Sequence, residues 1–174
     1  MKTTLKPPGN ESCSTRYCLE GFHSFQNRRL NIDLEIVPYN LLFRNDSTET
    51  FTNEPFFKQP NGNLLVNGEQ ILYFIKEQLE KNFLIFKRFS IEAYFYLSIK
   101  LNNIKNMNLT PMMIGRNHYN NFDELQLPIT LLQNDIQEIK KQLKNVVDIL
   151  WQSGGANECP QGTFNKVFDK FSLG

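Results

Sequence analysis

The cysteines and one histidine are the side chains best suited to bind a metal in this chain. Cys13, Cys18 and His23 stand at five-residue intervals, and Cys159 lies far downstream. Zinc fingers place paired ligands about two to four residues apart, so this spacing argues against a zinc site. Cys159-Pro160 follows a glycine pair, which predicts an exposed position and a free thiol. We expect no metal and no cofactor.

Two other residue sets near the N-terminus resemble catalytic groups. His23, Ser24 and Asp33 are the residue types of a hydrolytic triad, but no nucleophile-elbow motif surrounds the serine. Asp33 and Glu35 share a face of a predicted strand, yet a third metal ligand is missing. His118 lies in a predicted loop. The sequence therefore favours a non-enzymatic protein, with an enzyme assembled from distant residues as an alternative.

Basic and aromatic residues combine in one region, as they do on surfaces that bind single-stranded nucleic acid. Tyr94, Tyr96 and Lys100 alternate along a predicted strand, and Lys87 and Arg88 precede them closely. Outward-facing tyrosines are also explained by β-propensity alone, and an acidic residue belongs to the same row. A nucleic-acid face here is an alternative hypothesis.

Alternation and turn signals predict the elements of the first 120 residues. Residues 1–28 are polar and lack a period, which predicts an N-terminal arm, while Leu30–Ile36 alternates like a strand with one buried face. A second short strand is expected over 40–44, followed by a surface loop over 45–53. Pro60-Asn61-Gly62 indicates a turn.

A helix and a hairpin are expected next. Asn67 caps the predicted helix with Gln70 three residues on, and its apolar spacing ends near Lys81-Asn82. The short aromatic run 83–89 and the alternating run 91–101 predict two antiparallel strands, or one long bent strand. Residues 102–121 are polar and predict a long loop.

Seven apolar residues near the C-terminus repeat with the 3,4 spacing of a coiled coil. We call them the heptad series: Ile129, Leu132, Ile136, Ile139, Leu143, Val146 and Leu150. Pro128 fits the first turn of this predicted helix, and Ser153-Gly154-Gly155 predicts its end. Such a narrow apolar stripe needs a partner helix, so we expect it to form an oligomer or partner interface. Packing within a monomer is the alternative.

Bulk composition sets outer limits on fold and location. The chain has 174 residues, a net charge of +1 and 40% hydrophobic residues, which predicts a folded, soluble protein without a strong field for nucleic acid. No apolar run is long enough to span a membrane. The absence of a signal-peptide pattern and the three cysteines, an odd number, predict a cytoplasmic or nuclear protein.

Together these patterns predict an α+β fold. We expect a polar arm over 1–28, an antiparallel β-rich head with one packed helix over 29–121, an amphipathic heptad helix over 122–152, and a tail over 153–174. Phe164, Val167, Phe168 and Phe171 give that tail helical spacing. The predicted function is that of an assembly or adaptor protein that self-associates or binds a protein partner.

Overall fold

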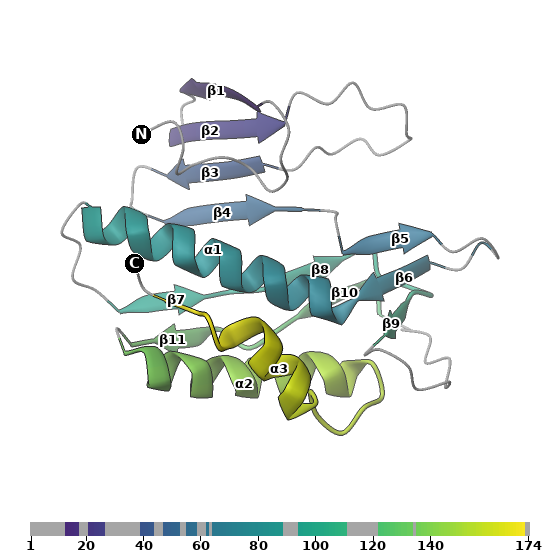
Figure 1. Cartoon of the computed structure of the whole chain (residues 1–174). Helices are drawn as coiled ribbons and strands as arrows, with labels where there is room; N and C mark the ends of the chain where they lie inside the picture. Colours follow the sequence, from purple (N-terminus) through teal and green to yellow (C-terminus); the bar gives the residue numbers. More distant parts are fainter. Residues whose placement is uncertain are drawn as a thin grey trace.

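The protein is described here by a computed structural model. It describes residues 13–17, 21–26, 39–43, 47–52, 55–58, 62, 64–88, 94–110, 122–133 and 135–172. Within these residues the chain forms three helices and eleven short strands (Figure 1). Six of the seven strand pairs are antiparallel, and two of the three helices follow the last strand. The chain is an α+β protein, as predicted.

The first sheet has four antiparallel strands in the order β1-β2-β3-β4. They are β1 (Cys13–Tyr17), β2 (Gly21–Gln26), β3 (Tyr39–Phe43) and β4 (Thr48–Phe51). The short strand predicted over 40–44 is confirmed as β3. The strand predicted at Leu30–Ile36 lies outside the described residues.

Two segments that lack apolar alternation are nevertheless strands of this sheet. The prediction of an arm over 1–28 is wrong for β1 and β2, and the loop predicted over 45–53 contains β4. Each of these strands is held by pairing with a neighbour. Backbone hydrogen bonding stabilises a polar strand without an apolar side-chain period, so periodicity alone misses it.

A second sheet joins β5 (Phe56–Lys58), β6 (Leu64–Asn67) and β9 (Asn108–Thr110), with β6 in the middle. β6 pairs with β5 antiparallel and with β9 parallel. The turn predicted near Gly62 agrees with its backbone, which has a positive φ of 87°. Because β9 is a strand, the prediction of a loop over 102–121 is wrong for residues 108–110.

Helix α1 (Gly68–Arg88) begins where its capping residue predicts. The Asn67 side chain accepts a hydrogen bond from the backbone N–H of Gln70 at 3.2 Å. The helix continues past its predicted end near Lys81 and ends at Arg88. The prediction of a strand over 83–89 is therefore wrong for residues 83–88. Phe83 is buried and lies edge-to-face against Phe95, and this packing outweighs the β-propensity of the aromatic run.

The third structural unit is a pair of antiparallel chain segments, 94–102 and 122–132, which we call the hairpin. Its strands are β7 (Phe95–Leu97) with β11 (Thr130–Leu132), and β8 (Lys100–Asn102) with β10 (Glu124–Gln126). The predicted alternation is confirmed from Tyr94 to Leu101, where even-numbered residues are exposed and odd-numbered ones are at least half-buried. The partner of this strand is the segment 122–132, whereas the sequence predicted pairing with residues 83–89.

A bulge interrupts the hairpin between its two paired regions. Lys100 faces Gln126 and Leu97 faces Thr130, so three residues on one segment oppose two on the other. Pro128 sits in this bulge, where its missing N–H breaks no ladder bond. The prediction that Pro128 opens a helix is therefore wrong, because the chain is still extended there.

Helix α2 (Ile136–Ser153) is the C-terminal amphipathic helix, and it starts later than predicted. Asp135 is its N-cap and accepts from the Glu138 N–H at 2.9 Å. Gly154 is its C-cap, as the sequence predicts. A short helix, α3 (Gln161–Phe168), follows and buries Phe164, Val167 and Phe168, which confirms the helical spacing of the tail.

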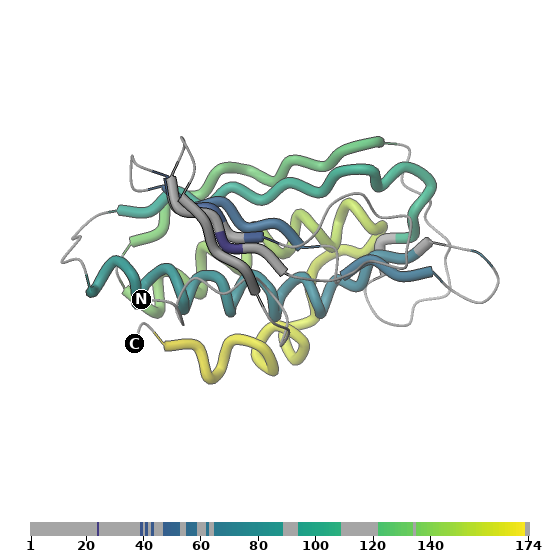
Figure 2. The backbone as a smooth tube through the Cα atoms, turned by 90° about the horizontal axis from the view of Figure 1, so that it is seen from above, coloured from purple at the N-terminus to yellow at the C-terminus, as the bar shows by residue number. Residues whose placement is uncertain are grey.

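The helices lie in layers against one side of the hairpin. In Figure 2 the hairpin runs along the upper part of the picture, α1 and α2 lie below it, and α3 lies lowest, on the far side of α1 and α2 from the hairpin. The main core fills the space between these layers and includes Leu72, Leu132, Leu143 and Phe168. Gly68 allows α1 to approach the buried Trp151 of α2, because a Cβ there would lie 2.9 Å from the indole ring.

Candidate functional site

The heptad series is divided between core and surface. Six of its members are strand or helix residues that face the interior, and Leu132, Ile139, Leu143, Val146 and Leu150 are buried in the single chain. Ile136 is half-buried against the same core. The 3,4 spacing therefore marks the inward side of β11 and α2, and the interpretation of these residues as an intermolecular interface is corrected. Ile129 is the exception, with 68% of its surface exposed.

The side of the hairpin that faces away from the helices carries exposed residues from both segments. We call this surface the outer face, and it consists of Tyr94, Tyr96, Ser98, Lys100, Glu124, Gln126, Ile129 and Leu131. Both tyrosines of the predicted nucleic-acid surface lie on it, as does Lys100. It is the clearest candidate for a functional site among the described residues.

One half of the outer face is apolar. Tyr94 and Tyr96 are 69% and 75% exposed. Tyr96 lies opposite Leu131, which is 37% exposed, so the two side chains share the surface. The bulge turns Ile129 to the same side. Large apolar side chains gathered on one exposed surface are typical of interaction sites.

The other half is polar, and its side chains bond to one another. The Lys100 Nζ lies 2.7 Å from a Glu124 carboxylate oxygen. The Gln126 amide donates to the Ser98 hydroxyl at 3.1 Å and contacts the Ile99 and Leu127 carbonyls at 3.2 and 3.1 Å. The charges cancel and the donors are largely used. Both side chains of the ion pair stay exposed, at 44% and 62%, so the pair neutralises this half without burying it.

Lys87 and Arg88 are placed beside the hairpin but in another layer. They are exposed in the last turn of α1. Phe86, in the same turn, stacks on Phe95 with ring centroids 4.4 Å apart. The basic end of α1 therefore lies near the start of β7, at the apolar end of the outer face (Figure 1). The structure brings these residues to one end of the hairpin without placing them on its outer face.

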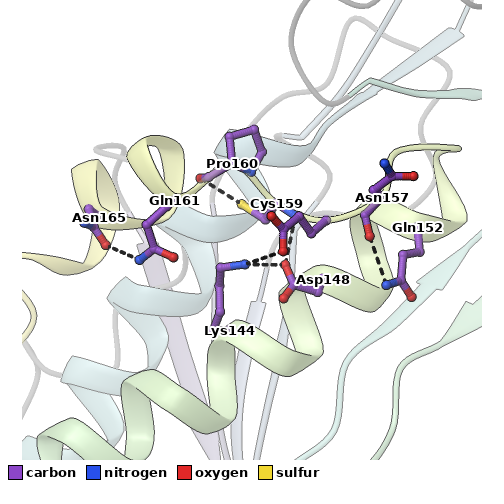
Figure 3. A network of polar contacts seen from close by, with 9 residues as sticks. Lys144, Asp148, Gln152, Asn157, Cys159, Pro160, Gln161 and Asn165 are labelled. Atoms are coloured by element: carbon purple, nitrogen blue, oxygen red, sulfur yellow. Dashed lines mark hydrogen bonds and ion pairs between the residues drawn. The ribbon is translucent and has the colours of Figure 1, made fainter.

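Cys159 is buried, which corrects the expectation of an exposed thiol. Its backbone N–H donates to Asp148 at 2.8 Å, and the same carboxylate oxygen lies 2.6 Å from Lys144 (Figure 3). Burial raises the pKa of the thiol from 9.0 to about 11, with smaller effects from the neighbouring charges. The network fastens the loop between α2 and α3, and the protonated thiol is unsuited to nucleophilic chemistry.

Cys159 should resist alkylation while the chain is folded. At neutral pH the thiol is protonated and covered, so iodoacetamide should modify it only after denaturation, as followed by peptide mass spectrometry. Folding stability should also fall as the pH rises from 9 toward 11, because the unfolded chain then releases a proton that folded Cys159 retains. Rapid labelling of Cys159 in the folded chain at pH 7 would contradict this account.

The other candidate catalytic and metal residues are not brought together in the described part of the chain. His23 and Ser24 are adjacent residues of β2. Cys18, Asp33, Glu35 and His118 lie outside the described residues. Among the residues that are described, no three histidine, cysteine or acidic side chains gather as a metal site.

Two further ionisable pairs join elements of the fold. Glu69, buried in the first turn of α1, accepts a hydrogen bond from Lys166 of α3, and this bond raises the pKa of Lys166. Tyr39 donates to Glu49 across the β3–β4 pair, and burial together with this bond raises the pKa of Tyr39 to about 12. Both pairs connect neighbouring elements, which accounts for them structurally.

Comparison with known proteins gave no match to a protein-family model, to a curated protein or to a solved structure. In the described ranges, no helix combines the length and apolar character needed to cross a bilayer.

Proposed function

We propose that this chain is a non-enzymatic assembly or adaptor protein, and that the apolar half of the outer face is its contact surface for a protein. The observation that carries the proposal is the exposed Tyr96–Leu131 cross-strand pair, flanked by Tyr94 and Ile129. Aromatic residues are enriched in the energetic centres of protein interfaces. The proposal moves the interface from the heptad series to the hairpin.

The bulge supports this proposal independently of exposure. An isoleucine gains nothing from contact with water, and a regular ladder would pair every residue of the segment. The extra residue lets Leu127 and Leu132 stay buried while Ile129 joins Tyr96 and Leu131 outside. Bulges of this kind commonly re-aim a side chain at a functional site.

A photo-crosslinking experiment tests the proposal. With p-benzoylphenylalanine in place of Tyr96, irradiation in an extract of the source cells should give a discrete protein adduct, either with a second copy or with another protein. The adduct should disappear with Leu131→Lys and persist with Leu84→Lys, an equivalent change at an exposed position of α1. The proposal would be refuted if no adduct formed, or if the adduct persisted with Leu131→Lys.

Binding of single-stranded nucleic acid is the second candidate, favoured by Tyr94, Tyr96 and Lys100 on one exposed surface. Bases can stack on tyrosines regardless of sequence. The ion pair between Lys100 and Glu124 weighs against it, because phosphate binding needs uncompensated cations. Titration of a labelled oligonucleotide should then show affinity that falls steeply with salt and is lost with Tyr94→Ala and Tyr96→Ala together.

A further inference from the structure

We propose that the first sheet, β1–β4, undocks from α1 as a unit while the rest of the chain stays folded. This motion is independent of the contact surface on the hairpin. The position of the core, a polar contact between the sheet and α1, and two buried polar groups without partners all favour it.

The main core lies on one side of a division in the sequence. Its members, and the half-buried apolar side chains packed against them, belong to Phe56 or to later positions. The first sheet has described apolar side chains that are half-buried but not packed against that core, namely Tyr39, Leu41, Phe43 and Phe51. Tyr39 stacks on Phe51 within the sheet, with ring centroids 5.7 Å apart. In the described part of the chain, apolar burial therefore contributes little to holding β1–β4 against the core.

The contact between the sheet and α1 includes a polar pair. β4 is the strand of this sheet that lies next to α1 (Figure 1). The Thr50 hydroxyl of β4 donates to the Gln78 Oε1 of α1 at 3.3 Å. This distance is long for a hydroxyl donor. Such a bond between neutral groups adds little net stability, because water replaces it when it breaks.

Two buried polar atoms on this side of the sheet lack hydrogen-bond partners. One is the Gln78 amide nitrogen, and the other is the Ser24 hydroxyl of β2. Ser24 lies opposite position 40 of β3, which lies opposite Thr50, so Ser24 and Thr50 share a face of the sheet. A buried polar group without a partner is destabilising. Undocking gives up a weak hydrogen bond and lets water reach two groups that the closed state leaves unpaired.

Helix α1 is held in place by contacts that do not involve the first sheet. Glu69 accepts a hydrogen bond from Lys166 of α3, and Glu80 accepts from the backbone N–H of Ser172 at 3.2 Å. Undocking therefore leaves α1 on the core and uncovers its side at Gln78. The open state is a partial unfolding confined to one sheet, of the kind that proteins populate below the free energy of global unfolding.

Hydrogen exchange of the wild-type chain, followed by mass spectrometry over a range of urea concentrations, tests the proposal. After correction for intrinsic rates, we expect the amides of β1–β4 to exchange together and about tenfold or more faster than those of α2. Their exchange should also depend less on urea, because undocking exposes less surface than global unfolding. Exchange that differs from strand to strand, or that matches α2 in rate and urea dependence, would overturn the proposal.

The double substitution Thr50→Val with Gln78→Met tests the contribution of the polar contact. It removes the hydroxyl, its acceptor and the unpaired amide together while nearly preserving shape, so exchange of β1–β4 should slow by about threefold or more. Exchange of α2 should not change. Gln70→Met, at an exposed position of α1, should leave both rates unaltered.

Circular dichroism checks that the variants are folded, and the wild-type measurement decides the question if the double variant is not. A folded double variant in which β1–β4 exchanges as fast as in the wild type, or faster, would overturn the proposal.

Discussion

Replacing Ile139 with lysine should unfold the chain, whereas the same replacement at Ile129 should leave it folded. Ile139 is completely buried between α2 and the hairpin, while Ile129 is exposed in the bulge. A lysine at position 139 would lose apolar contacts and place an unpaired charge in the core, which should cost about 4 kcal/mol or more of unfolding free energy. Urea denaturation followed by circular dichroism measures both effects.

The two residues form a matched pair because both belong to the heptad series. For Ile129→Lys we expect a change within about 0.5 kcal/mol, as for other surface substitutions. If Ile139→Lys stayed folded with near wild-type stability and changed only the oligomeric state, the assignment of the heptad series to the core would be refuted. This result would restore a helix–helix interface between chains.

Replacing Phe168 with alanine should give the second-largest loss of stability. Phe168 of α3 is almost fully buried, stacks on Phe164 with centroids 4.7 Å apart, and contacts Phe171 edge-to-face. Removing the ring leaves a cavity and breaks both aromatic contacts, so we expect a cost of about 3 to 5 kcal/mol in thermal or urea unfolding. The loss should be shared by α1, against which α3 packs.

Phe122→Ala is the control for this change, since it removes the same ring from an exposed position. Its effect should be several-fold smaller than that of Phe168→Ala. Equal losses would show that ring burial in α3 is not the source of the effect. A Phe168→Ala chain that retained wild-type stability would mean that α3 contributes nothing to the core.

Local signals in the sequence predicted some elements well. The capping side chain of Asn67 located the N-terminus of α1, and the glycines after Ser153 located the C-terminus of α2. The alternation from Tyr94 to Leu101 identified both faces of a strand. These features depend on residues within one or two turns of each other, and their physics is therefore contained in short stretches of sequence.

Features that depend on distant pairing could not be predicted in this way. The extent of α1 beyond Lys81 depends on aromatic contacts with Phe95, and β9 depends on its parallel pairing with β6. The 3,4 spacing of the heptad series is shared by a coiled-coil seam and by the inward side of a core helix. Spacing alone does not distinguish the two, because it contains no information on what covers the stripe.

The candidate site was predicted in part. Tyr94, Tyr96 and Lys100 were placed together by their alternation, but Ile129 and Leu131 were missed because the heptad series assigned that stretch to a helix. A proline at position 128, followed by an isoleucine, a threonine and two leucines, was the available signal for an extended segment.

The bulge lets this stretch lose one residue without exchanging its two faces. Deleting one residue between Gln126 and Thr130 would leave two residues opposite two and join the paired regions into a continuous ladder with both registers kept. Leu131 would still lie opposite Tyr96, and Leu132 opposite Phe95. A codon lost from the bulge would therefore be tolerated by the strand pairing, whereas a codon lost within β11 would move each later residue of that strand to the opposite face.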